Sequence, residues 1–281
     1  MERPLSGQKP AIALPEGATD THMHAYVPGF PSLPGGPANP EGRVGPEEYR
    51  RLMDWLGIDR VVVVQGNAQQ MDNANLLAAV AALGPIARAV AAVAPDESEA
   101  ELQRLHDAGV RGARIMDLSG GAVGLSALPA VAERVAPFGW TTIVQFDGSR
   151  LLDHLPALEA IPGRYVIDHH AKFLSAPPTE AHVDALRRLI DRGNCWFKFC
   201  ACYESSKVGG PDYGDIAPLA RRIAEESPER VIWGTNWPHN SAKTPAEYPD
   251  DAALVDTVLG WAPASALRKI LVESPAELFD F

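Results

Sequence analysis

The chain has 281 residues, of which 46% are hydrophobic and 22% are charged, as in an ordinary globular protein. Its formal net charge of −11 and the lack of any Lys/Arg run argue against a nucleic-acid partner. No apolar stretch reaches the ~18 residues that a membrane-spanning helix needs, and residues 1–17 are polar and Pro-rich. We therefore expect a cytoplasmic protein with a short tail at 1–17 and one domain at 18–281. The oligomeric state stays open.

Short apolar runs alternate with amphipathic segments along the chain. Helices are predicted at 46–57, 73–84 and 97–109, where Pro46 suits a first helical turn. Near-continuous apolar strands indicate burial on both faces, as in parallel sheets. Eight such strands alternating with helices predict an α/β fold, a single (β/α)8 TIM barrel. The strands are predicted at 18–24, 60–67, 87–94, 110–116, 141–147, 165–170, 194–201 and 229–236.

Two further observations bear on the architecture. A doubly wound open sheet is the second choice, but no G-x-G-x-x-G motif follows the first predicted strand. The Gly/Pro-rich segment 28–46 is too long for a simple connection between a strand and a helix. We therefore expect it to cover the mouth of the barrel.

Polar side chains gather at the ends of the predicted strands, where barrel enzymes place their catalytic groups. Core burial alone would favour Val or Ile there, because an unpaired buried polar group costs ~1–3 kcal/mol. The set as a whole predicts a polar site, although Arg114 and Lys198 could each be half of a structural ion pair. Its members are Asp20, His22, His24, Gln65, Asn67, Arg114, Gln145, Asp147, His169, His170, Lys198, Tyr203, Glu204, Asn236 and His239.

Several of these stretches resemble the amidohydrolase superfamily. They are "DTHMH" at 20–24, "VIDHH" at 166–170 and "WGTNWPH" at 233–239. Within the superfamily the chain is similar to the branch of galactarolactone isomerases and 2-pyrone-4,6-dicarboxylate lactonases. The isomerase pattern is carried by "PGGP" at 34–37, "GARIMDL" at 112–118, "VQFDG" at 144–148, the segment 196–206 and "GTNWPHN" at 234–240. The resemblance runs from residue 18 to the end and implies a barrel enzyme that acts on lactones.

The resemblance also implies roles for individual residues. His22, His24 and His169 match histidines that bind a divalent ion in metal-dependent members. In the lactonase branch they are expected to act without metal, as hydrogen-bond donors and proton carriers. We therefore expect no cofactor, with Zn²⁺ on these three histidines as the less favoured alternative. Arg114 matches an arginine that binds a substrate carboxylate.

Asn236 stands where most members of the superfamily have the aspartate that activates water. An amide cannot accept a proton at neutral pH, so hydrolysis is disfavoured. Isomerisation of a hydroxylated lactone needs no water, because the substrate's own 4-hydroxyl attacks the C1 carbonyl. We expect an isomerase that converts D-galactaro-1,5-lactone to the 1,4-lactone in sugar-diacid catabolism. The alternatives are a lactone hydrolase and an inactive sugar-acid-binding protein.

The predicted site divides into catalytic and substrate-binding residues. The catalytic set is His22, His24, His169, Asn236 and Asp147. The general base is Asp147 or His169, which the sequence does not separate. The residues expected to bind the carboxylate and hydroxyls of the lactone are Arg114, Gln65, Asn67, Gln145, Lys198, Tyr203 and His239.

Overall fold

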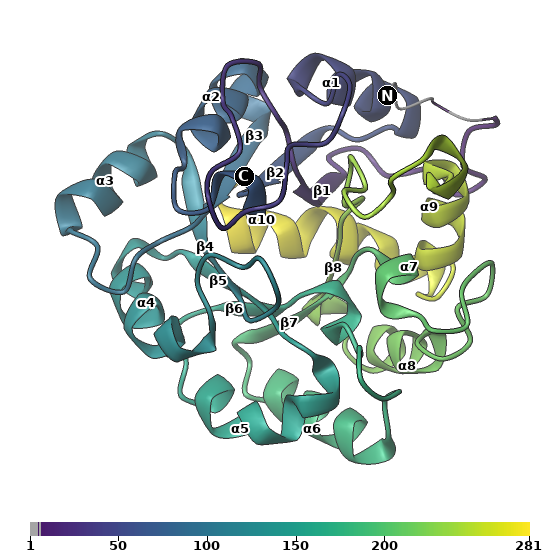
Figure 1. Ribbon diagram of the computed structural model, residues 1–281. Coiled ribbons are helices and arrows are strands. Elements are labelled where there is room, and N and C mark those ends of the chain that lie inside the picture. The colour runs from purple at the N-terminus through teal and green to yellow at the C-terminus, as the bar shows by residue number, and fades with distance from the viewer. Residues whose placement is uncertain (1–4, 6) are drawn as a thin grey trace.

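A computed structural model, which describes residues 5 and 7–281, contains one eight-stranded parallel sheet (Figure 1). Each strand pairs with the next along the chain, in the order β1 to β8. This arrangement confirms the predicted (β/α)8 barrel. The strands are β1 (Thr19–Met23), β2 (Arg60–Val64), β3 (Ala87–Ala91), β4 (Val110–Met116), β5 (Thr141–Gln145), β6 (Tyr165–Ile167), β7 (Cys195–Phe199) and β8 (Val231–Trp233).

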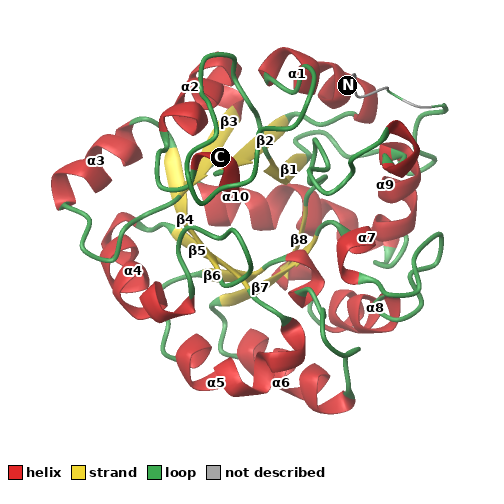
Figure 2. Ribbon diagram, viewed as in Figure 1, coloured by secondary structure: helices red, strands yellow, loops and turns green. Residues whose placement is uncertain are grey.

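The helices form a layer outside the strands (Figure 2). Those predicted at 46–57, 73–84 and 97–109 are confirmed as α1 (Pro46–Leu56), α2 (Ala74–Leu83) and α3 (Glu99–Asp107). Among the described residues, no helix is both long and apolar enough to cross a membrane. The others are α4 (Leu128–Val135), α5 (Leu151–Glu159), α6 (Glu180–Asp191), α7 (Cys202–Ser205), α8 (Ala217–Glu226), α9 (Asp251–Leu259) and α10 (Ser274–Phe279).

Alternate residues of each strand face two different apolar regions, as the two-residue period of a strand requires. Val61 and Val63 of β2 pack in the outer core between the strands and the helices. Val62 and Val64 pack inside the barrel, in a separate cluster that also contains Leu278 of α10. The barrel interior is therefore a packed core, and α10 closes one end of the barrel. The polar site therefore lies at the opposite end.

Several strands end earlier than predicted. β2 ends at Val64 rather than at 67, β6 at Ile167 rather than at 170, and β8 at Trp233 rather than at 236. The backbone turns out of the sheet just beyond two of these ends, with φ of 52° at His169 and 62° at Asn236. Such left-handed angles are incompatible with a strand. Most of the predicted polar residues therefore lie on the loops above the barrel.

The predicted N-terminal tail at 1–17 is held against the outer helix layer where the structure describes it. The backbone N–H groups of Ala11 and Ile12 donate to the carboxylate of Asp256 in α9, over 2.9 and 2.8 Å. Residues 1–4 and 6 lie outside the described residues.

The seam between β1 and β8 is closed by side chains. The hydroxyl of Thr21 donates to the carbonyl of Trp233 over 2.7 Å. The buried carboxylate of Asp20 accepts hydrogen bonds from the backbone N–H and the hydroxyl of Thr235, over 3.0 and 2.5 Å. It also accepts one from the hydroxyl of Tyr49 in α1 over 2.7 Å. Burial raises the pKa of Asp20 to about 6, although these bonds favour the ionised form. Asp20 thus holds β1, α1 and the end of β8 together.

The substitution Thr235→Val tests this seam. Valine keeps the volume of threonine but removes the hydroxyl that donates to Asp20, so a buried carboxylate oxygen loses a donor. We expect the free energy of unfolding to fall by about 1–3 kcal/mol. Urea denaturation followed by circular dichroism measures it, with Thr257→Val on the half-buried surface of α9 as the matched control. Equal stability of the two variants would contradict the role of Asp20.

Candidate active site

A buried carboxylate, Asp168, lies at the centre of the polar cluster at the strand ends. Its Oδ1 atom is 3.2 Å from Nζ of Lys198, and both side chains are inaccessible to solvent. Its Oδ2 atom lies 3.1 Å from Nδ1 of His169 and 3.4 Å from Nδ1 of His22. Burial alone would raise the pKa of Asp168, but Lys198 and the two histidines hold it well below its usual value. Asp168 is therefore ionised.

The hydrogen bonds around His22 and His24 define which ring nitrogens carry protons. Lys198 can only donate, and its Nζ lies 3.2 Å from Nδ1 of His22. Nδ1 of His24 lies 2.8 Å from the carbonyl of Val64, which can only accept. The two Nε2 atoms are 3.3 Å apart. Oδ2 of Asp168 also lies 3.4 Å from this Nδ1 of His22, but it makes no hydrogen bond there. The contacts with Lys198 and His24 therefore place a proton on Nε2 of His22, pointing at the lone pair on Nε2 of His24.

Both of these histidines are neutral. Burial lowers the pKa of His22 well below its usual value, and burial together with the charge of Arg114 lowers the pKa of His24 to about 3. The pair is thus a short donor–acceptor chain that starts at the ammonium of Lys198. His24 is the end of this chain that is accessible from the cavity described below.

His169 completes the histidine cluster. Its ring lies edge to face with that of His22, with centroids 4.8 Å apart. Its Nδ1 atom lies 3.1 Å from Oδ2 of Asp168, although the two atoms do not form a hydrogen bond. A carboxylate beside Nδ1 favours a proton there and leaves Nε2 as the basic nitrogen. His169 is therefore suited to proton transfer.

Arg114 faces inward from β4 and is fixed on one side. Its Nη1 donates to the carbonyl of Gln65 over 2.5 Å and to Oδ1 of Asn67 over 3.1 Å, while Nη2 donates to Oε1 of Gln145 over 3.3 Å. Its Nε–H is buried without a partner in the described chain. The edge formed by Nε and Nη2 has the geometry that can bind a carboxylate side-on, as the same edge of Arg104 does with Glu101 on the surface of this protein.

Asn236 lies beside the histidines at the end of β8. Its backbone N–H donates to the carbonyl of His22 over 2.8 Å. Its side-chain Nδ2 donates to the hydroxyl oxygen of Tyr203 over 2.9 Å and to Oε1 of Glu204 over 3.3 Å. Glu204 in turn forms an ion pair of 2.7 Å with Lys172. The amide therefore stands between a phenol and an ionised carboxylate.

His239 is wholly buried behind Tyr203. Its Nε2 lies 2.9 Å from Oδ1 of Asp251, and its Nδ1 lies 2.8 Å from the hydroxyl of Tyr203. This contact orients the phenol of Tyr203, and His239 itself does not line the cavity described below.

A cavity of about 460 Å³ opens above His24 and Arg114. Part of the segment 28–46 forms one wall, as expected from the sequence. Gly36 lets this segment approach the turn after β2 closely, because a Cβ there would collide with the carbonyl oxygens of Asn67 and Ala68. The cavity is lined by His24, Tyr26, residues 37–41, Asn67, Arg114, Asn240, Ala242 and Lys243.

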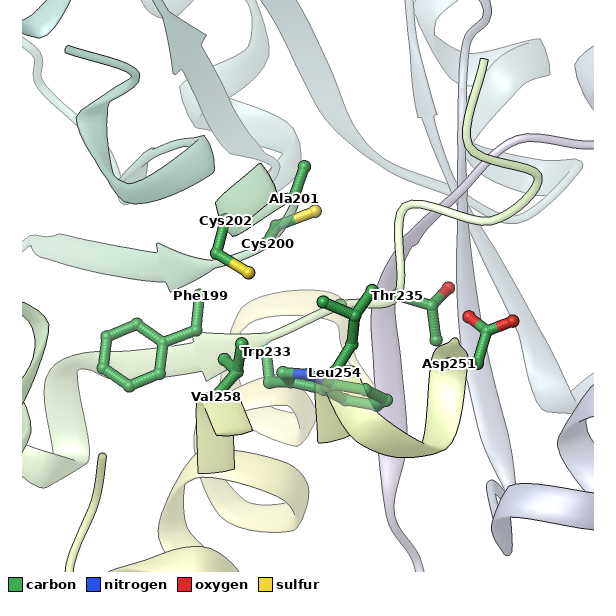
Figure 3. A pocket seen from close by; sticks show the side chains of 10 residues that line it. Phe199, Cys200, Ala201, Cys202, Trp233, Thr235, Asp251, Leu254 and Val258 are labelled. Atoms are coloured by element: carbon green, nitrogen blue, oxygen red, sulfur yellow. The ribbon is translucent and has the colours of Figure 1, made fainter. Parts of the chain in front are cut away.

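A second hollow lies on the outer side of the barrel, between the ends of β7 and β8 and helix α9 (Figure 3). Its volume is only about 10 Å³, at most enough for a single water molecule. It is lined mainly by apolar side chains such as Phe199, Trp233 and Leu254. We regard it as a packing defect, because a sugar lactone cannot enter it.

Two predicted residues are turned away from the cluster. Gln65 follows Val61 and Val63 at the alternate positions that face outward from the barrel. Its Nε2 donates to the carbonyls of Gln70 and Asp72 over 3.0 and 2.8 Å. Asp147 accepts hydrogen bonds from the backbone N–H groups of Ser149 and Leu174 and from the hydroxyls of Ser149 and Ser175. These bonds outweigh burial and lower its pKa to about 2. This placement argues against Asp147 as the general base.

Two acidic residues of the cluster, Asp168 and Asp251, are absent from the predicted polar set, and a third, Glu204, belongs to that set but has no predicted role. Asp168 comes two positions after Val166, which faces the barrel interior. The two-residue alternation along β6 therefore already indicated that Asp168 faces inward. Glu204 follows β7 within a short helix, so no strand period points to it. Asp251 begins α9, far along the chain from Tyr203, and no local pattern connects them.

Comparisons with known proteins agree with this geometry. A family model described as Amidohydrolase matches residues 19–281. The D-galactarolactone isomerase of Agrobacterium fabrum (strain C58) is 55% identical over 280 residues, which cover 99% of this chain and 96% of that protein. The 2-pyrone-4,6-dicarboxylate hydrolase of Comamonas testosteroni is 36% identical, with coverage of 96% and 92%. An Agrobacterium tumefaciens protein crystallised in its apo form is 53% identical, with a TM-score of 0.92 and coverage of 97% and 98%.

Proposed function

The chain belongs to the amidohydrolase family, and from this membership we propose that it isomerises D-galactaro-1,5-lactone to the 1,4-lactone. The observation that carries the proposal is the amide of Asn236, which occupies the end of β8 beside His22. An amide cannot deprotonate a water molecule, so the site suits acyl transfer within the substrate. The similarity to an isomerase over 99% of the chain supports the same conclusion.

The chemistry requires one proton carrier. The oxygen of the 4-hydroxyl attacks the C1 carbonyl while Nε2 of His169 takes its proton, and Asp168 stabilises the resulting imidazolium. The tetrahedral intermediate then collapses. The bond between C1 and the 5-oxygen breaks, and His169 returns the proton to that oxygen. No atom is gained or lost, in agreement with an isomerisation.

The cluster supplies positive charge for the oxygen that develops on C1. Lys198 is buried and donates to His22, so the Nε2–H of His22 is polarised toward the site. When a substrate carbonyl replaces His24 as the acceptor, this N–H stabilises the oxyanion in a water-poor environment. Arg114 binds the free carboxylate through its Nε–Nη2 edge. Asn67 and Gln145 hold Arg114 in place, and Tyr203 contributes to binding of the hydroxyls.

The donor set does not fit a divalent ion well. A metal between His22 and His24 needs both Nε2 atoms unprotonated, which moves the proton of His22 to Nδ1, opposite the ammonium of Lys198. That N–H would then face the ammonium at 3.2 Å, with Oδ2 of Asp168 at 3.4 Å as an acceptor. The ligand atoms of His22, His169 and Cys200 do lie within 4.8 Å of one another. Burial, however, raises the pKa of the Cys200 thiol well above its usual value, which opposes metal binding. We therefore propose a metal-independent reaction.

We also propose that the reaction serves sugar-diacid catabolism in the cytoplasm. The name of the 55% identical relative supports the substrate class. Cys195, Cys200 and Cys202 are buried and unpaired, as in proteins of a reducing compartment. Activity found only outside the cell membrane would contradict the location.

Proton NMR of the 1,5-lactone incubated with the protein tests the function directly. We expect the 1,4-lactone to form faster than in buffer, without open diacid as the first product. Open diacid as the first product would show a hydrolase. A rate equal to that in buffer would show a protein that at most binds sugar acids.

The substitution Arg114→Lys tests the carboxylate clamp. Lysine is a point charge that cannot present two parallel N–H groups, so KM should rise at least tenfold and kcat should fall. Steady-state kinetics measure both. Arg111→Lys is the matched control, because Arg111 lies on the same strand but contacts His106 and Asp280 at the other end. Constants within about twofold of the parent for Arg114→Lys would rule out the clamp.

Removal of metal ions tests the metal-independent reaction. After dialysis against a strong chelator we expect the rate of isomerisation to stay within about twofold of its initial value, because no step needs a Lewis acid. Elemental analysis of the same sample gives the metal content. Stoichiometric zinc, together with activity that is lost on its removal and restored by its return, would overturn the proposal.

The substitution Asn236→Asp tests why water is not activated. A general base contributes typically 10²–10⁴-fold, so acid release from the lactone should increase at least tenfold. Glu204 faces the same position over 3.3 Å, and two neighbouring carboxylates raise the pKa of one of them. Acid release should therefore increase as the pH rises.

Titration of released acid at constant pH measures this effect. Asn194→Asp, at the opposite end of the barrel, is the control for an added carboxylate. Parental acid release by a folded Asn236→Asp variant would mean that the amide is not what prevents hydrolysis.

A further inference from the structure

The side-chain amide of Asn236 has a defined direction. Its Nδ2 lies 3.3 Å from Oε1 of Glu204 and 2.9 Å from the hydroxyl oxygen of Tyr203. An ionised carboxylate can only accept a hydrogen bond, so the amide atom that faces Glu204 has to be the nitrogen. Burial alone would raise the pKa of Glu204, but Lys172 and His169 lower it to about 2, so it is ionised near neutral pH.

The second contact has the same direction. Asp251 can only accept, so Nε2 of His239 carries the proton and Nδ1 carries a lone pair. That lone pair accepts the hydrogen of the Tyr203 hydroxyl over 2.8 Å. The phenol oxygen is then an acceptor for Asn236. Both N–H groups of the amide thus point along chains that end at a carboxylate, Glu204 on one side and Asp251 on the other.

We propose that Glu204 is a positioning residue that locks the Asn236 amide, so that its Oδ1 rather than its Nδ2 is presented to the substrate. Oδ1 has no donor among the described residues, and the backbone of Asn236 lies against His22. A carbonyl oxygen there accepts a hydrogen bond from a substrate hydroxyl, which orients the ring for attack. This role for the hydroxyl depends on the isomerase function proposed above, whereas the locked amide does not.

The proposal assigns different consequences to the two partners of Glu204. Lys172 binds Oε2, and Asn236 binds Oε1. In Glu204→Gln the side chain can donate as well as accept, so the amide of Asn236 is free to rotate by half a turn. In Lys172→Met the carboxylate remains as an acceptor, so the amide keeps its direction. A purely structural ion pair would make the two variants alike.

NMR of protein with ¹⁵N-labelled asparagine tests the lock without any substrate. The two Nδ2 proton signals of Asn236 are identified as the pair that is missing from Asn236→Asp. A hydrogen bond to a carboxylate shifts the bonded proton downfield. We expect this shift in the parent and in Lys172→Met, and its loss in Glu204→Gln. Equal signals in the parent and in Glu204→Gln would overturn the proposal.

Steady-state kinetics on the 1,5-lactone test the consequence. We expect kcat of Glu204→Gln to fall by about 10- to 100-fold, because a misplaced substrate reacts slowly, with KM within about threefold of the parent. Lys172→Met should keep kcat within about threefold. A parental kcat in Glu204→Gln would overturn the positioning role. An inactive parent would overturn the isomerase function alone, and the NMR result would still decide the direction of the amide.

A second variant keeps the test decisive if Glu204→Gln does not fold. Tyr203→Phe removes the oxygen that accepts from the other N–H of Asn236 and leaves Glu204 in place. The proposal then requires the second Nδ2 proton signal of Asn236 to move while the first keeps its downfield shift. Two unchanged signals would show that neither residue holds the amide.

Discussion

The buried charge of Asp168 is the constraint on which the site depends. A carboxylate without access to solvent is stable only when cations and donors surround it, and here Lys198, His22 and His169 converge on its two oxygens. These contacts join β1, β6 and β7 at the centre of the barrel. They also determine the protonation of the histidines, since the ammonium of Lys198 places the proton of His22 on Nε2. The buried ion pair thus positions the rings of His22 and His169 and favours the tautomer of His22 that carries the proton on Nε2.

The backbone around this ion pair is strained. His169, His170, Ala171 and Lys172 all have left-handed φ angles between 45° and 61°, and none of them is glycine. Such conformations cost of order 1–3 kcal/mol each and persist only where the surroundings over-determine them. The hydroxyl of Ser205 donates to the carbonyl of His169, and the ion pair with Glu204 holds Lys172. These left-handed residues turn the chain sharply after β6 and bring His169 back over the barrel.

Much of the fold and part of the site could be predicted from local sequence patterns. The alternation of apolar strands with amphipathic helices is periodic, and it determined the barrel and the approximate position of each strand. His22 and His24 are two positions apart, with one residue between them, and Arg114 stands at an inward-facing position of its strand. The two-residue period of a strand alone therefore brings them to the inner face. The predicted strands extend too far toward their C-terminal ends, because no local sequence pattern indicates the left-handed turns after β6 and β8. The sequence therefore identified the polar residues as a group, but it did not indicate the directions in which their side chains point.

Those directions were decided by tertiary contacts between distant parts of the chain. Asp147 and Glu204 are both carboxylates placed after a strand, and nothing in their neighbourhoods separates them by sequence. Leu174 and Ser175 donate to Asp147 and turn it away from the histidines, whereas Glu204 lies beside them in contact with Asn236 and Lys172. The sequence by itself determined that an amide rather than a carboxylate follows β8, so this position offers no carboxylate base to a water molecule. Only the tertiary structure decided which way that amide points, because hydrogen-bond direction depends on partners that folding brings together.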